Sequence, residues 1–150
     1  MTVNKILEAI ASKLTAIWPD RNVFVNKIPK GADGNFFVGV IETNQEKKLD
    51  RRRRRSCQIE VLYFLKSDDN MAFNNWADTM YDNFETLDVF ETLDVEKGAN
   101  KTRRLYLTGQ TARKDESGVF QFLFDVNINF VMAPEAIEFM ENLTQKEELK

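Results

Sequence analysis

The stretch from Gly118 to Met132 constrains the fold more than any other, because its even positions are all apolar. These positions are Phe120, Phe122, Phe124, Val126, Ile128, Phe130 and Met132. The odd positions include Gln121, Asp125, Asn127 and Asn129. Successive side chains on a strand point to opposite faces, so the pattern predicts a long strand with one buried face. The aromatic face needs a cover, and the polar face is a candidate assembly surface.

Two amphipathic helices are the predicted cover. The first runs from Val3 to Trp18, with apolar residues at spacings of three and four, and Pro19 ends it because proline cannot continue the hydrogen-bond ladder. The second carries a buried stripe from Ala72 to Leu87. The Asp68-Asp69-Asn70 sequence before it supplies candidate N-caps.

Further strands are predicted where β-branched and aromatic residues cluster or alternate with polar ones. They span residues 22–28, 36–41, 57–65 and 101–111, with a polar connection at 43–50 and a hairpin loop at 114–118. A six-residue sequence, FETLDV, occurs twice in tandem, at Phe84 to Val89 and Phe90 to Val95. This period is far too short for a repeat architecture. We expect the first copy to finish the second helix and the second to begin an edge strand or loop.

The order of these elements predicts an α+β fold, in which a mostly antiparallel β-sheet is covered by two helices. A chain of 150 residues, 43% of them hydrophobic, suits a single domain, which we place at residues 1–133. Residues 134–150 form a charged C-terminal tail, predicted to be helical, with Ile137, Met140 and Leu143 or Thr144 along one side. No apolar run reaches the ~20 residues of a membrane helix, so we expect a soluble protein with no membrane partner.

The residues offer little to catalysis. The chain has no histidine, which removes the commonest general base and most zinc sites. Its one cysteine, Cys57, falls in an apolar alternation and is predicted to be a buried thiol. Gly31 and Gly34 lack the spacing of a phosphate-binding loop. We therefore expect no enzymatic activity, no catalytic residue, no cofactor, no metal and no small-molecule substrate.

Charge is strongly segregated along the chain, although the net charge is only -3. Residues Lys47 to Arg55 contain seven basic side chains and one acid. Residues Asp68 to Glu96 contain nine acids and no Lys or Arg, and Lys101 to Lys114 contain five basic residues and no acid. Such a chain is polarised rather than simply acidic.

Five adjacent arginines form the sharpest local signal: Arg51, Arg52, Arg53, Arg54 and Arg55. Three interpretations are compatible with the sequence. The run is a solvated loop or strand end, or it contacts nucleic-acid phosphates, or it docks on the acidic segment of another copy. In the third case, the candidate partners are three acids on the wet side of the second helix, Asp78, Asp82 and Glu85, and a heterologous contact of this kind closes a ring if the rotation allows.

The segment Asp50 to Asn70, DRRRRRSCQIEVLYFLKSDDN, resembles the arginine-rich turn, alternating strand and acidic break of phage tail terminator proteins. The N-terminal helix, the Phe-rich strand and the hairpin through Ser117 to Phe124 are similar to that family in order and spacing. The resemblance covers Met1 to Met132. The duplicated FETLDV and the tail after Pro134 depart from the family pattern.

The resemblance implies a non-enzymatic structural protein of a phage or prophage. Members are expected to form a homo-oligomeric ring, commonly a hexamer, that caps the tail tube protein, stops polymerisation and joins the tail to the head connector. It implies a place at the head-proximal end of the virion tail, with assembly in the host cytoplasm. Arg51 to Arg55 are then the residues expected to contact another subunit, the tail tube or DNA passing through the ring. Two alternatives remain at this stage: a nucleic-acid-binding protein that uses Arg51 to Arg55, and a head completion or connector protein.

Overall fold

The computed structural model describes residues 1–31, 33–65, 69–94 and 96–132. Two helices and six strands follow one another in these ranges. In chain order they are α1 (Val3–Ile17), β1 (Val23–Phe24), β2 (Phe36–Lys47), β3 (Arg52–Tyr63), α2 (Asn70–Asn83), β4 (Thr86–Asp94), β5 (Ala99–Lys114) and β6 (Phe120–Val131). The predicted tail helix after residue 134 lies outside the described residues.

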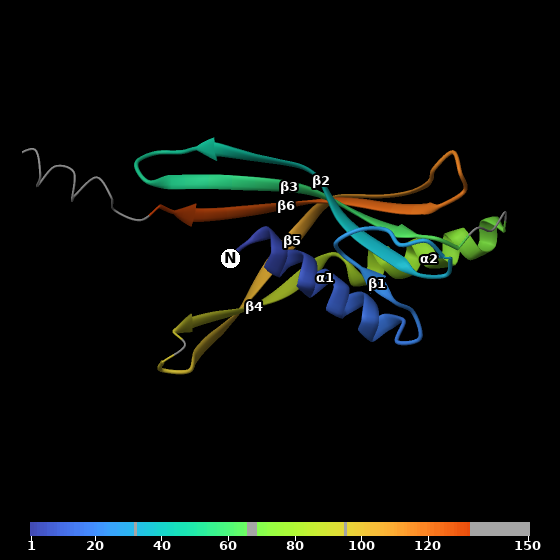
Figure 1. Ribbon diagram of the computed structural model, residues 1–150. Coiled ribbons are helices and arrows are strands. Elements are labelled where there is room, and N and C mark those ends of the chain that lie inside the picture. The colour runs from blue at the N-terminus through green and yellow to red at the C-terminus, as the bar shows by residue number, and fades with distance from the viewer. Residues whose placement is uncertain (32, 66–68, 95, 133–150) are drawn as a thin grey trace, which may run out of the picture.

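The strands form one curled sheet in the order β1-β2-β3-β6-β5-β4 (Figure 1). All neighbouring pairs are antiparallel except β1 and β2. The α+β class, with a mostly antiparallel sheet and two helices, is therefore confirmed. β3 and β6 lie side by side over twelve residue pairs, from Arg52 and Val131 to Tyr63 and Phe120, so the strand predicted from the alternation is central in the sheet.

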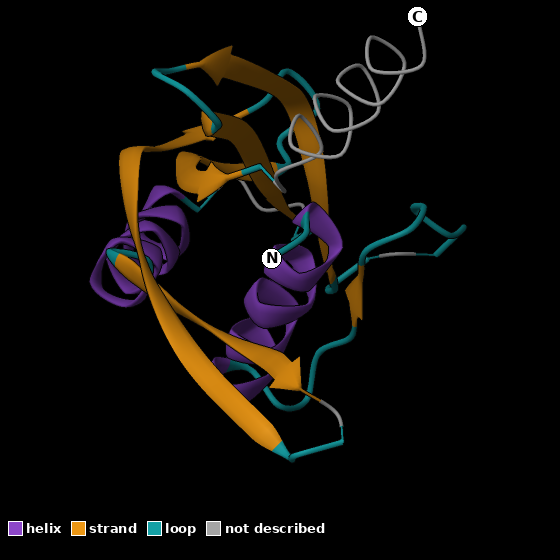
Figure 2. Ribbon diagram, turned by 90° about the vertical axis from the view of Figure 1, so that its left-hand side faces the viewer, coloured by secondary structure: helices purple, strands orange, loops and turns teal. Residues whose placement is uncertain are grey.

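Helix α1 covers the part of the sheet that curls around it (Figure 2). Thr2 caps its start, since the Thr2 hydroxyl accepts a hydrogen bond from the Lys5 N–H at 3.2 Å. Ile6, Ile10 and Leu14 are completely buried. Each buried aliphatic side chain contributes about 1.5 to 3 kcal/mol, so this stripe secures the helix to the sheet as the sequence predicts.

Helix α2 packs on the aromatic face of β6. The Trp76 ring lies 5.5 Å from Phe120 and 6.5 Å from Phe122, between ring centres. Phe122 and Phe124 also lie beside Phe84, at 6.2 and 6.0 Å. Offset and edge-on contacts of this kind add to the energy of burial. Three of the four aromatic residues in the alternation therefore lie in the core near α2, and the fourth, Phe130, is half-buried beyond the helices.

The polar face of β6 becomes more exposed along the strand from Gln121 to Asn129. Gln121 is buried, with its amide oxygen 2.6 Å from Arg113 Nε and its amide nitrogen 2.7 Å from Glu60 Oε2. Asp125 is half-buried and Asn129 is exposed. The idea that this whole face is an assembly surface is therefore wrong at the Gln121 end, where both faces are buried within one subunit.

Strand β5 leaves β6 half-way along its length and continues beside β4. It pairs with β6 through residues 107–114 and with β4 through residues 99–106. The register shifts between Thr108 and Thr111, and Gly109 adopts a φ of +66° in this bulge. A bulge bends its strand. Beyond Val126 the neighbour of β6 in the described sheet is β3.

Three predicted boundaries are wrong. α2 ends at Asn83, and Phe84 is its C-cap, so both FETLDV copies contribute to β4 rather than the first finishing the helix. The strand predicted at residues 22–28 is only the two residues of β1. β2 extends to Lys47, because the polar residues expected to form a connection pair with β3.

None of the described helices is long and apolar enough to cross a membrane.

Candidate assembly surface

The far end of β2, β3 and β6 extends past both helices, as Figure 1 shows. We call residues 42–56 and 127–132 the basic arm. The core face of β3 explains where the arm begins. Cys57 is completely buried, but the next two positions on the same face are Arg55 and Arg53. Their cross-strand partners in β6 are Ile128 and Phe130, so charged groups replace apolar ones as the strands leave the helices.

Arg55 is the best-anchored member of the arginine run. Its Nη2 and Nε donate hydrogen bonds to Gln45 Oε1 at 2.8 and 3.2 Å. Its guanidinium lies 4.9 Å from the centre of the Phe130 ring. A cation over an aromatic face is attracted by the ring quadrupole. Arg55 is therefore partly a structural residue that covers the last aromatic ring of β6.

Two other arginines contact backbone carbonyls at the tip of the arm, where β2 turns into β3. Arg53 Nη1 donates to the carbonyl oxygens of Asp50 and Arg52 at 3.1 and 2.8 Å. Arg51 Nη1 lies 3.5 Å from the carbonyl of Met132. Asp50 has a φ of +57°, a left-handed conformation that Asp tolerates better than most residues. The Arg53 bonds stabilise the β2–β3 turn itself, and the Arg51 contact joins the turn to the end of β6.

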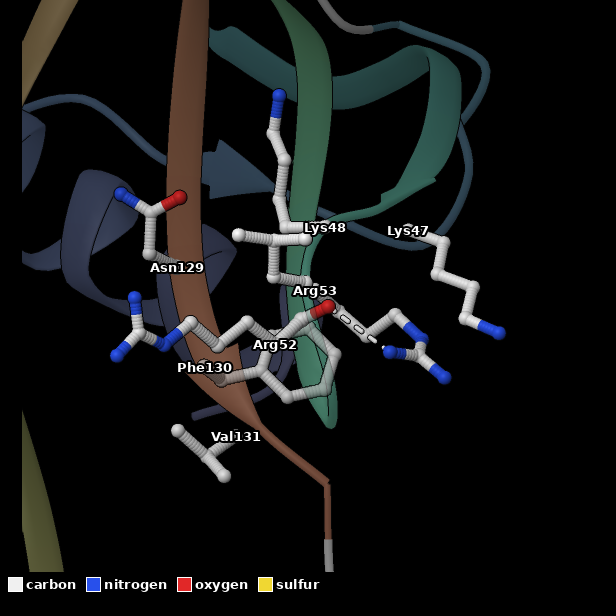
Figure 3. Close-up of a pocket in the computed structure, with 8 residues that line it drawn as sticks. Lys47, Lys48, Arg52, Arg53, Asn129, Phe130 and Val131 are labelled. Atoms are coloured by element: carbon white, nitrogen blue, oxygen red, sulfur yellow. Dashed lines mark hydrogen bonds between the residues drawn. The ribbon is translucent and has the colours of Figure 1, made fainter.

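Arg52 and Arg54 lie on the opposite face from Arg55 and make no side-chain hydrogen bond within the described ranges. Figure 3 shows the guanidinium groups of Arg52 and Arg53 on opposite sides of β3. Arg54 is the cross-strand partner of Glu46, but Lys48 Nζ binds Glu46 at 2.8 Å. This Lys48 hydrogen bond, and to a smaller extent Arg54, lowers the pKa of the Glu46 carboxyl.

None of the five arginines forms a salt bridge with a carboxylate of the described residues.

An open groove of about 810 Å³ lies at the tip of the arm (Figure 3). We call it the tip groove. Its lining residues are Lys47, Lys48, Leu49, Arg52, Arg53, Asn129, Phe130 and Val131. Leu49 is 79% exposed and Val131 is 62% exposed. The tip groove therefore combines exposed apolar side chains with four cations, and the sequence signal for it was Phe130 continuing the alternation beyond the helices.

The three predicted acidic partners lie elsewhere. Asp78 and Asp82 are exposed on α2, and Glu85 is exposed just after it. Figure 1 places α2 at the end of the molecule opposite the tip of the arm. The structure thus leaves Asp78, Asp82 and Glu85 exposed at or just after α2 and does not bring them to the arginine run of the same chain.

Other acids of the same segment are matched within the chain. Asp88 accepts two hydrogen bonds from Arg104, at 2.8 and 3.2 Å, and Glu91 lies 2.9 Å from the N-terminal ammonium. The hydrogen bond from Arg104 lowers the pKa of the Asp88 carboxyl. The basic block at 101–114 therefore neutralises part of the acidic segment, which the sequence pattern alone did not indicate.

Cys57 lies in the hydrophobic core of the domain. Burial raises the pKa of the Cys57 thiol, and the prediction of a buried thiol is confirmed. The described residues contain no group of three or more Cys, Asp or Glu side chains placed to hold a metal ion. The most distinctive surface described is thus the basic arm.

A family model for phage tail terminator proteins matches residues 5–138. The chain belongs to the phage tail terminator family. The match spans the complete described fold from the first turn of α1 to the end of β6, and the resemblance predicted from the sequence is confirmed. No curated protein sequence matches the chain. Residues 139–150 lie beyond the family match.

Membership in the tail terminator family identifies the protein as a component of the virion tail. The basic arm is therefore a feature of a tail terminator, and its unmatched cations are to be interpreted in the context of an assembly.

Proposed function

We propose that this tail terminator acts as a homo-oligomeric ring that caps the tail tube, stops its polymerisation and joins the tail to the head, without enzymatic chemistry. The observation that carries the proposal is the separation of unmatched charge. The arginines of the basic arm form no salt bridge with described acids of their own chain, and the exposed acids of α2 lie at the other end of the molecule.

In the proposed contact, the arm of one subunit reaches the α2 surface of the next. Arg52 and Arg54 face Asp78 and Asp82, with Glu85 beside them. The two surfaces differ, so the contact is heterologous, and it forms a ring when the rotation between subunits closes. Exposed ion pairs contribute little individually. Their role is to orient neighbouring subunits, while apolar contacts supply most of the affinity.

The ring has two kinds of external partner in this proposal. One rim meets the tail tube protein and the other meets the head connector or completion protein. The resemblance favours a hexamer, assembled in the host cytoplasm. Cations that remain unmatched around the lumen would contact passing DNA without reading its sequence, because phosphate contacts carry no base information.

Nucleic-acid binding as the primary function is the second candidate. It is favoured by Arg52 and Arg54, whose guanidinium donors are open to phosphate oxygens. Its signature is a steep loss of DNA affinity with added salt. A head completion or connector role is a related structural alternative, which differs in the rim that contacts the tail tube.

Sedimentation velocity at low and high salt tests the proposal. The wild type should sediment as an oligomer at low salt, and Arg52→Ser/Arg54→Ser should shift it toward monomer and reduce tail joining in complementation. These two arginines suit the test because, unlike Arg55, they do not pack on Phe130. Lys27→Ser/Lys30→Ser, which removes the same charge from an exposed loop, is the matched control.

A strict monomer at both salt concentrations would contradict the ring. Tight duplex binding by the wild type, lost in Arg52→Ser/Arg54→Ser while tail joining is retained, would favour the nucleic-acid function instead.

A further inference from the structure

The tip groove fits a particular kind of occupant. Leu49, Phe130 and Val131 offer apolar contacts, and Lys47, Lys48, Arg52 and Arg53 surround them with positive charge. Two described acids adjoin the lining residues in sequence: Asp50 at the turn, and Glu46, which binds Lys48 at 2.8 Å. A complementary segment therefore carries apolar side chains at regular spacing and several carboxylates.

The C-terminal part of this chain has that composition. Residues 135–149 contain five glutamates and one lysine. Ile137, Met140 and Leu143 recur every third residue, which is the spacing of one side of an amphipathic helix. Eighteen residues follow Met132, and most of them lie beyond the family match. As a helix, these fifteen residues would extend about 22 Å.

The position of this segment favours exchange between subunits. Val131, which lines the groove together with Phe130, is separated from the segment by only three residues. Pro134 follows two residues after Met132, and proline favours an extended conformation at the residue before it. An extended conformation at residue 133 disfavours a reversal of the chain into its own groove directly after Met132.

We propose that the tip groove binds residues 135–149 of a second copy of this chain, with the glutamates near the cationic rim and Ile137, Met140 and Leu143 against Leu49, Phe130 and Val131. This inference rests on the proposed function, because it requires subunits placed side by side. It adds a second contact to the one between the basic arm and α2, and it gives the C-terminal tail a binding site.

Disulfide trapping in the full-length protein tests the contact. Leu49→Cys places a thiol at the tip groove, and Met140→Cys places one in the tail. Native Cys57 does not interfere, since it is completely buried. The two variants, carrying tags of different mass, are mixed and oxidised gently. A disulfide-linked heterodimer is expected in the mixture, with little crosslinking when either variant is oxidised alone.

Charge reversal makes the test specific. Lys47→Glu/Lys48→Glu in the groove variant should lower the heterodimer yield about tenfold, since like charges at an interface are strongly unfavourable. Adding Glu138→Lys/Glu141→Lys to the tail variant should restore it. Lys27→Glu/Lys30→Glu, in a loop outside the groove, is the matched control and should leave the yield unchanged.

Two results would overturn the inference. One is the absence of a heterodimer in the mixture while a chain carrying both cysteines closes an internal disulfide, which would place the tail in its own groove. The other is the absence of both products. Sedimentation of the same samples separates this failure from that of the ring, because oligomers without crosslinks contradict only the groove contact and monomers contradict the proposed assembly.

Discussion

The Arg55 guanidinium lies 4.9 Å from the centre of the Phe130 ring and donates two hydrogen bonds to Gln45. This contact joins all three strands of the basic arm, because Gln45 is in β2, Arg55 in β3 and Phe130 in β6. It also divides the arginine run by role. Arg55 holds the arm together, whereas Arg52 and Arg54 remain available to another molecule.

Arg55→Ala should destabilise the protein, because it exposes Phe130 and removes the cation over its ring. A double-mutant cycle with Phe130→Ala should give a coupling free energy of about 0.5 to 1 kcal/mol, measured by urea unfolding. Arg54→Ala is the matched control, and its cycle with Phe130→Ala should show no coupling. Equal effects of the two arginines would contradict the division of roles.

Phe122→Ala should be far more damaging than Phe130→Ala. Phe122 is completely buried, with ring contacts to Trp76, Tyr81 and Phe84. Truncating a buried Phe costs about 3 to 5 kcal/mol, whereas Phe130 lies beyond the helices. Thermal unfolding followed by circular dichroism measures both variants. Similar losses from the two substitutions would show that the arm is part of the core.

The Asp88–Arg104 pair should make stability depend on acid pH. Its hydrogen bond lowers the folded pKa of Asp88 below the ordinary value of 3.8. The stabilisation is therefore complete above that value and is lost as pH falls through the lower folded pKa. Asp88→Asn should reduce stability at pH 7 and flatten its decline below about pH 4, measured by urea unfolding at each pH.

The effect of Asp88→Asn should disappear in an Arg104→Gln background, since the partner is then absent. A pH profile that Asp88→Asn leaves unchanged in the wild-type background would contradict the role of the pair.

Much of the fold was predictable from two periodicities. The alternation at Phe120 to Ile128 and the helical spacing at Ile6, Ile10 and Leu14 both record burial against the same core. The part of the arm that β2 contributes was not predicted. Residues 42–47 are exposed on both faces, so no hydrophobic alternation marks them as a strand, and only their pairing with β3 makes them one.

The FETLDV duplication shows why the end of α2 was mispredicted. Phe84 is completely buried at the C-cap of α2, whereas Phe90 is 58% exposed in β4. The two phenylalanines have the same following residues, so local sequence does not distinguish their environments. Leu87 also continues the helical stripe while it alternates with polar neighbours as a strand residue. Short apolar patterns fit both periods, and packing decides between them.

The sequence identified the charged residues of the candidate site, but it did not predict where they lie relative to one another. Segregation along the sequence pointed to Arg51–Arg55 and to the acids of α2, and the structure places the two sets at opposite ends. The sequence did not separate the acids that form ion pairs, such as Asp88 and Glu91, from those that form none among the described residues. That distinction depends on strand pairing between β4 and β5, and on where the N-terminus lies.

Light scattering of mixed charge-reversed subunits tests the arm-to-α2 contact most directly. Arg52→Glu/Arg54→Glu places two carboxylates opposite Asp78 and Asp82 at the proposed contact. Asp78→Lys/Asp82→Lys places two cations opposite Arg52 and Arg54. Each alone should remain monomeric through like-charge repulsion, and an equimolar mixture should recover the mass of the wild-type ring by alternating the two. If the mixture stays monomeric where the wild type assembles, or either variant assembles alone, the account is wrong.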